Sequence, residues 1–238
     1  MKDNSLHRRW IGIKDKLTSM TWGQRVEYIW TYHKTTIVLS LIFLYLLNYL
    51  LIGKITSKDI LIGAIHANVE LSENGRSFIT SDFFEMQQGD PQKEDISILD
   101  VALTKIADDE YFEMNYYYLQ VVLTQVGAQQ VDYILADKIA MEIFMTQDIY
   151  MNLRDIFSAD ELANLEDRLI YLLPVDENGE STVDEKFPVA IDVSGMPFFA
   201  AHANSKEPIY FSVASNAPNT EAVIALWTYL TTWCPSQS

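Results

Sequence analysis

A long apolar run without any charged residue lies near the start of the chain, at residues 35–53. Lys34 and Lys54 bound it, and only Ser40 and Asn48 within it are distinctly polar. As a helix, these 19 residues extend about 28 Å at ~1.5 Å per residue, close to the ~30 Å hydrocarbon core of a bilayer. A core helix of a soluble protein usually keeps a polar stripe, whereas this run is apolar all round. The pattern therefore predicts a transmembrane helix.

The surroundings of the run predict a retained span rather than a cleaved signal peptide. A signal peptide has a short charged region and an apolar core of about 7–15 residues. Here 34 residues precede a longer run, and the following "GKITSKD" offers no small-x-small cleavage site. Aromatic residues of the kind that gather at membrane interfaces precede the run or lie toward its far end: Tyr28, Trp30, Tyr32, Tyr45 and Tyr49.

The distribution of basic residues predicts the orientation of the span. Residues 1–36 carry seven Lys/Arg against three Asp/Glu, and only Lys54 and Lys58 lie just beyond the run. The more basic flank faces the cytoplasm. We therefore expect a single-pass cell-membrane protein with a cytoplasmic N-terminus and an extracytoplasmic domain at residues 54–238.

Residues 1–34 predict a basic amphipathic segment on the cytoplasmic side. Apolar residues recur at helical spacing with basic residues between them: Leu6, Trp10, Ile13 and Leu17. Such a helix lies on an anionic inner leaflet. Thr21 and Gln24 match a capping box and predict where the next helix begins. A generic anchor and a docking site for a cytoplasmic partner both fit this segment.

Beyond the span, short apolar runs alternate with stretches of helical periodicity. Six runs are typical of strands: residues 60–67, 96–103, 131–136, 169–175, 188–194 and 209–214. Helices are predicted at 112–126, after Asp137 as a cap, at 159–167 behind a Ser158–Glu161 capping box, and from Thr220. The Asn74-Gly75 pair predicts a hairpin turn. Strands interleaved with helices predict an α/β domain, a mixed sheet with helices on both faces.

Charge narrows the choice of partners for this domain. The chain has a net charge of −16, and residues 54–238 carry ten Lys/Arg against thirty Asp/Glu. Such a domain repels nucleic acid phosphates and anionic lipid headgroups, so we expect no nucleic acid partner. The bilayer is expected to contact the chain through residues 35–53. Cys234 is the single cysteine, so no intrachain disulfide is possible.

Residues 116–162 resemble the extracellular solute-binding proteins of bacterial ABC importers. In that family a helix ends in a small-residue turn, a short strand carries an "aDv" type motif, and an "l.dL" segment follows. Here these are Gly127-Ala128, Val131–Leu135 and Asn152–Asp155. The stretches 188–199 and 210–230 are similar to the return crossing and the ending of that family.

The resemblance implies a periplasmic-binding-protein-like lobe in a bacterial membrane protein. Solute-binding proteins close two lobes on a ligand, but only 185 residues follow the span, which is short for two lobes. The anchor also differs from the usual lipoprotein cysteine. We therefore expect one lobe that binds small solutes weakly, because no second wall buries them.

A search for catalytic and ligand-binding chemistry leaves few candidates. The sequence holds no Gly-x-Ser-x-Gly elbow, P-loop or His-Glu-x-x-His motif. His66 and His202 lack closely spaced partners, so structural roles are expected and neither a metal nor a cofactor is predicted. Ligands of α/β sheets bind at the carboxyl ends of strands. That places Asp137, Asp192 and Ser194 as candidate ligand-binding residues, with a helix cap and solvated strand ends as the plainer interpretations.

Three functions are compatible with these patterns. The first is a non-enzymatic binding module, in which the span presents the solute-binding-like domain outside the cell for ligand or protein interaction. The second is an accessory subunit of a transporter or secretion assembly, in which Ser40 and Asn48 bond a partner helix. The third is a membrane-tethered hydrolase that uses Asp137 and Asp192, which requires both carboxylates in one cleft.

Overall fold

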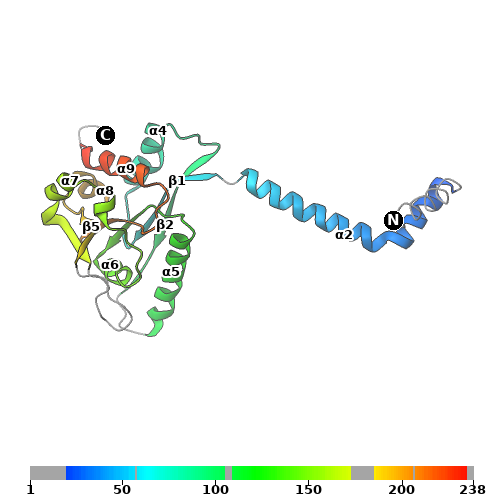
Figure 1. The fold of residues 1–238 in the computed structure, drawn as a ribbon, viewed down its shortest axis with the longest axis horizontal. Coiled ribbons are helices and arrows are strands. Elements are labelled where there is room, and N and C mark those ends of the chain that lie inside the picture. The colour runs from blue at the N-terminus through cyan, green and yellow to red at the C-terminus, as the bar shows by residue number, and fades with distance from the viewer. Residues whose placement is uncertain (1–19, 57, 105–108, 173–184, 206, 235–238) are drawn as a thin grey trace, which may run out of the picture. The chain divides into compact units, whose positions relative to one another are not determined.

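The computed structural model describes residues 20–234 apart from 57, 105–108, 173–184 and 206 (Figure 1). The predicted amphipathic helix at residues 6–17 therefore lies outside the described residues. The chain divides into two compact units, Met1–Ser57 and Lys58–Ser238, and each is described by itself.

The described part of the first unit is dominated by one helix, α2 (Trp22–Thr56). Its start agrees with the predicted cap, because the Thr21 backbone N–H donates to Gln24 Oε1 at 3.1 Å. Among the described residues, no single helix meets the length and composition of a membrane span. Two stretches of α2, Trp22–Tyr28 and Trp30–Tyr49, meet them together and are bent by 63°. The transmembrane helix at 35–53 stays a prediction.

The second unit is built on a mixed six-stranded sheet. Its strands are β1 (Asp59–Ala67), β2 (Glu94–Val101), β3 (Tyr133–Asp137), β4 (Leu169–Leu172), β5 (Phe187–Asp192) and β6 (Ile209–Val213). Their order is β2-β1-β3-β6-β5-β4. Strands β1, β2 and β3 run parallel, β6 is antiparallel to β3 and β5, and β4 is antiparallel to β5. The predicted α/β class and mixed sheet are confirmed.

Helices cover both faces of this sheet (Figure 1). The helices of the second unit are α3 (Glu73–Ser77), α4 (Phe84–Met86), α5 (Asp109–Gly127), α6 (Lys138–Phe144), α7 (Ala159–Asn164), α8 (Pro197–His202) and α9 (Thr220–Thr232). A π-helix at Phe78–Phe83 and 3-10 turns at Leu153–Asp155 and Glu166–Arg168 complete them. One core layer packs α7, α8, α9 and the π-helix against the sheet, and the other packs α5 and α6.

Local caps agree with the sequence, and one turn does not. Ser158 and Glu161 form both bonds of the capping box of α7. The hairpin predicted at Asn74-Gly75 is wrong, because these residues belong to α3. A Cβ at Gly75 would come within 2.6 Å of the His202 Cβ, so this glycine allows close packing and not a turn.

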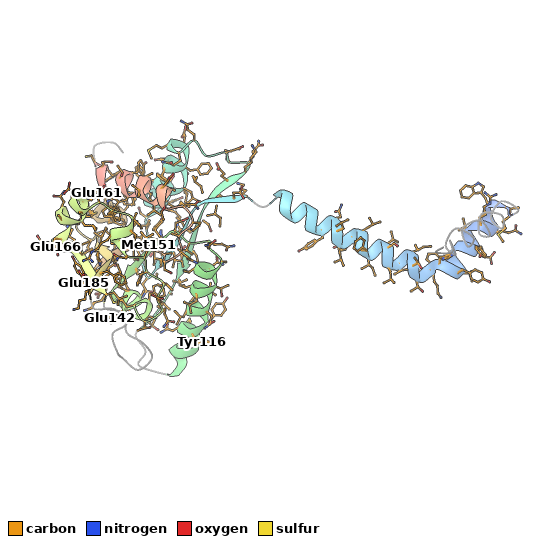
Figure 2. All side chains as sticks on the ribbon, viewed as in Figure 1. Tyr116, Glu142, Met151, Glu161, Glu166 and Glu185 are labelled. Atoms are coloured by element: carbon orange, nitrogen blue, oxygen red, sulfur yellow. The ribbon has the colours of Figure 1, made fainter. Side chains whose placement is uncertain are left out.

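Helix α5 contacts the core along its second half. Val122 and Val126 are buried there, and Leu119 and Leu123 pack against the same cluster. Tyr116, one turn earlier, is 57% exposed (Figure 2). The acidic side chains labelled in Figure 2 are all exposed, as the charge of this domain predicts: Glu142, Glu161, Glu166 and Glu185.

The buried Asp132, just before β3, connects β1 to the start of α9 through hydrogen bonds. Asp132 accepts hydrogen bonds from the backbone N–H of Gly63 at 2.8 Å and of Asn219 at 2.7 Å. Gly63 is in β1, and Asn219 directly precedes α9. A Cβ at Gly63 would overlap the carbonyl of Gln130, so only glycine allows this approach. The aspartate of the "aDv" type motif therefore has a structural role here.

Candidate functional site

The carboxyl ends of three parallel strands meet at one edge of the sheet, with β1 between β2 and β3. The chain leaves β1 toward β2 and later returns to β3 on the other side, which is the topology of a switch point in α/β sheets. A pocket of about 520 Å³ lies at this edge. The residues that line it are His66, Asn68, Val69, Glu70, Leu71, Arg76, Asp100, Val101 and Ala102.

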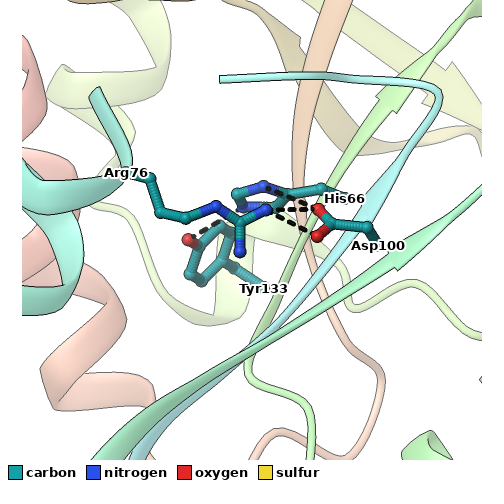
Figure 3. Close-up of polar contacts among 4 residues, drawn as sticks. All are labelled: His66, Arg76, Asp100 and Tyr133. Carbon is teal, nitrogen blue, oxygen red and sulfur yellow. Dashed lines mark hydrogen bonds and ion pairs between the residues drawn. The ribbon is translucent and has the colours of Figure 1, made fainter. Parts of the chain in front are cut away.

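Four polar side chains converge beside the pocket (Figure 3). His66 and Asp100 are the penultimate residues of β1 and β2 and are register partners. The Nη2 atom of Arg76, from α3, donates to both Asp100 oxygens at 2.7 and 2.6 Å. The hydroxyl of Tyr133, from β3, lies 3.2 Å from His66 Nε2. Strand pairing therefore brings together residues that are distant in the chain.

Burial decides the charge of His66. The residue is 1% exposed, and this burial lowers its pKa from 6.5 to about 4. The Asp100 carboxylate acts in the opposite direction, and the Arg76 guanidinium acts in the same direction. Burial also raises the pKa of Tyr133, so its hydroxyl keeps its proton. At neutral pH, an uncharged imidazole and an uncharged phenol face each other.

A hydrogen bond joins these two rings, because the Tyr133 hydroxyl lies 3.2 Å from His66 Nε2. Which group donates depends on which ring nitrogen of the neutral imidazole carries the proton. His66 Nδ1 has no hydrogen-bond partner in the described part of the chain, and Asp100 Oδ1 is 3.9 Å away. Because the His66 side chain is fully buried, its ring nitrogens are closed to a molecule in the pocket.

Asn68 fixes the loop that follows β1. Its φ of 59° is left-handed, a conformation that asparagine tolerates better than most residues. Its side-chain oxygen accepts from the Leu103 N–H at 2.7 Å, and its Nδ2 donates to the Leu103 carbonyl at 2.6 Å. Nδ2 also donates to Asp137 at 3.1 Å. The loops after all three parallel strands are thus connected before any ligand arrives.

The three candidates predicted from sequence lie at the carboxyl ends of β3 and β5 but not in this pocket. Asp137 caps α6 by accepting from the Ala140 N–H at 2.8 Å. Asp192 accepts from the Ser194 N–H at 2.9 Å and from its hydroxyl at 2.6 Å. Strand β6 lies between β3 and β5, so the backbones that carry the two carboxylates are two strand spacings, about 10 Å, apart. Each is occupied by internal hydrogen bonds.

No known protein family, curated protein or solved structure matches this chain. The solute-binding resemblance therefore stays a prediction.

His66 and His202 have different surroundings. His202 Nδ1 lies 3.3 Å from the Ser72 hydroxyl, and its ring packs among Phe78, Phe198 and Trp233. Within residues 20–234, outside the gaps given above, no three His, Cys, Asp or Glu side chains are placed to hold a metal ion.

The cluster has a buried half and a more exposed half. Tyr133 is completely buried and stacks on Phe211, so its hydroxyl cannot reach a molecule in the pocket. Asp100 and Arg76 have side chains that are 56% and 39% exposed. Sequence reasoning missed both of them. The available signal was a polar residue near the end of each of two neighbouring strand runs, at His66 and Asp100.

Proposed function

We propose that the chain is a single-pass bacterial membrane protein that presents a one-lobed α/β binding domain outside the cytoplasm. The observation that carries this proposal is that the apolar side chains of α2 take no part in the hydrophobic cores of the domain. Both hydrophobic cores consist of residues from Leu61 onward. Most large apolar side chains of α2 between residues 38 and 49 are exposed, among them Leu39, Leu41, Phe43 and Leu44.

Exposed apolar surface of this extent requires another solvent or partner. The stretch Trp30–Tyr49 of α2 has apolar side chains on all sides, and a bilayer covers such a helix evenly. Lys34 and Lys54 at the ends of the run suit the two headgroup regions. The bilayer is therefore the first partner of this chain.

Binding is favoured over hydrolysis by the state of the carboxylates. A hydrolase that uses Asp137 and Asp192 needs both in one cleft. Both are instead bonded internally, on either side of β6. The pocket over His66 offers the exposed polar groups of Arg76 and Asp100, an arrangement that suits recognition.

A role as accessory subunit of a transporter or secretion assembly is a second candidate. Asn48 favours it, because its exposed side-chain amide makes no hydrogen bond with any described residue of this chain. An amide in a hydrocarbon environment gains about 1 kcal/mol by bonding a neighbouring helix. Co-purification of a membrane partner with the wild-type chain, lost with Asn48→Leu, supports this role.

Cysteine accessibility tests the proposed topology. The background is Cys234→Ser, and single cysteines are placed by Asp160→Cys, in exposed α7, and by Lys14→Cys, before the span. An impermeant thiol reagent added to intact bacterial cells is expected to label position 160 at once. Position 14 is expected to react only after lysis. The opposite pattern overturns the orientation, and labelling of both positions in intact cells overturns the span.

A further inference from the structure

We propose that the outer edge of β4, together with a small pocket beside it, binds an extended, basic segment of another protein by adding a strand to the sheet. This surface is at the other end of the strand order from the pocket over His66, so the inference goes beyond the proposed function. It depends on the open edge of the sheet, on the shape of the pocket and on the charge around both.

The two outer strands of the sheet differ in their protection against pairing. Among the described residues, β2 and β4 each have a neighbouring strand on one side only. Proteins commonly guard such an edge with charged side chains, because its free N–H and C=O groups otherwise pair with another chain. Strand β2 carries Glu94, Asp95 and Asp100, and the Asp95 carboxylate accepts from the Ile96 N–H at 2.9 Å. Strand β4, with the sequence Leu-Ile-Tyr-Leu, carries no charged residue, so it is the less protected edge.

A pocket of about 250 Å³ lies beside β4. Leu169 and Tyr171 line it from the same face of the strand, and Leu162 of α7 and Pro188 of β5 add to its apolar wall. The Tyr171 hydroxyl donates to the two Glu166 oxygens at 2.9 and 3.1 Å, which holds this ring in place. The pocket is smaller than the about 300–1,000 Å³ of ordinary small-molecule sites, so it suits one side chain of a longer ligand.

The open edge and the pocket together fit the binding of an extended segment. In this mode of recognition, main-chain hydrogen bonds to the edge strand supply affinity, and pockets for alternate side chains supply specificity. Every second side chain of an added strand lies on the face of Leu169 and Tyr171. One apolar side chain of the segment therefore enters the pocket, and its neighbours point to the opposite face.

The charge around the edge selects the occupant. Residues 154–168, which lead into β4, carry five Asp/Glu against two Arg. One of these arginines, Arg154, is already paired with Glu185 at 3.2 Å. Figure 2 shows Glu161, Glu166 and Glu185 on this side of the domain. Lysine or arginine beside the apolar anchor complements these carboxylates, whereas an acidic segment or a second copy of this chain is repelled.

Fluorescence anisotropy of labelled peptides with the full chain in detergent micelles tests this inference. The probe has the sequence Lys-Lys-Val-Leu-Val-Lys-Lys, which combines an apolar centre with basic ends. One comparison peptide is N-methylated at the three apolar residues, so it keeps the charge and the side chains but cannot donate to a strand. The other has glutamate in place of lysine. We expect saturable binding of the probe and at least tenfold weaker binding of both comparison peptides.

A matched pair of variants tests the role of the pocket. Ala163→Trp fills the pocket from the exposed side of α7, and we expect at least a fivefold loss of affinity for the probe. Asn164→Trp adds the same side chain at the next exposed position, which does not line the pocket, and is expected to match the wild type. The comparison of the peptides uses only the wild-type chain, so it does not depend on the folding of either variant.

Four outcomes overturn the proposal. Absence of probe binding to the wild type excludes the docking surface, and equal binding of the N-methylated peptide excludes strand addition. Equal or tighter binding of the glutamate peptide excludes a basic occupant. Equal affinity of the two tryptophan variants excludes the pocket as the anchor site. None of these outcomes changes the cysteine labelling that tests the membrane topology.

Discussion

Asn68 donates its side-chain amide to both carboxylate oxygens of Asp137, at 3.1 Å each, across 69 residues of sequence. The contact links the loop after β1 to the end of β3, where α6 begins. The same amide reaches the carbonyl of Leu103 after β2. One side chain therefore organises the edge of the sheet at which the pocket lies.

Replacement of Asn68 separates conformational strain from hydrogen bonding. Asn68→Gly keeps the left-handed backbone but loses the side-chain bonds, and we expect it to lower the free energy of unfolding by about 1–3 kcal/mol. Asn68→Ala loses the same bonds and adds about 1 kcal/mol of strain. Urea unfolding of the full chain in detergent micelles measures both. Equal stability of the two variants contradicts the role of φ, and wild-type stability of both contradicts the role of the bonds.

The hydrogen bonds that Asp132 accepts predict that even a nearly isosteric substitution lowers the free energy of unfolding. Asp132→Asn turns an amide donor toward either the Gly63 or the Asn219 N–H, which leaves donors facing each other in the core. The expected loss is about 1–3 kcal/mol in urea unfolding. The matched change Asp160→Asn on exposed α7 is expected to stay within about 0.5 kcal/mol of wild type. Comparable losses at both positions refute the assignment.

His66 predicts a dependence of stability on pH. Its pKa is about 4 in the folded chain, against about 6.5 unfolded, so the unfolded state gains the proton first as pH falls. The protonation of His66 does not affect the free energy of unfolding well above pH 6.5. It lowers this free energy progressively between about pH 6.5 and pH 4, and the effect does not grow further below pH 4. Of the groups facing the ring, the Asp100 carboxylate raises the pKa of His66 and partly offsets the effect of burial, whereas the Arg76 guanidinium lowers it further.

The expected contribution of His66 is about 2 kcal/mol between pH 7 and pH 5. Urea unfolding at pH 7, 6 and 5 measures the slope, with His66→Gln as the comparison. The variant is less stable at every pH but has a shallower slope, which a purely structural effect does not produce. Parallel slopes in the two proteins argue against a buried neutral imidazole.

Charge placed in α2 tests the membrane span without touching the domain. Leu41→Lys combined with Leu44→Lys adds about 5–7 kcal/mol to the insertion of the helix. We expect the doubly substituted chain to be extracted by alkaline carbonate, whereas the corresponding double alanine variant stays in the membrane fraction. The urea unfolding of the domain is expected to be the same in both, because both cores begin at Leu61. Carbonate-resistant behaviour of the lysine variant excludes the span.

Features that depend on residues near each other in the chain could be predicted from the amino-acid pattern. Alternation of apolar runs located the strands. The Ser158–Glu161 pair located one helix cap, and Asp137, which accepts from the Ala140 backbone N–H, located another. Local pattern misjudged Asn74-Gly75, because a glycine that permits a turn also permits close packing, and here the packing partner is His202.

Which strands are neighbours, and therefore which side chains form the site, follows from the assembled fold. His66 meets Asp100 because β1 and β2 pair in one register, and it meets Tyr133 because β3 lies on the other side of β1. The same strand order separates Asp137 from Asp192 by β6. Strand order follows from burying two apolar layers over the whole domain at once. Because strand order depends on contacts across the whole domain, no short stretch of sequence predicts it. The pocket therefore could not be predicted before the strand order was known.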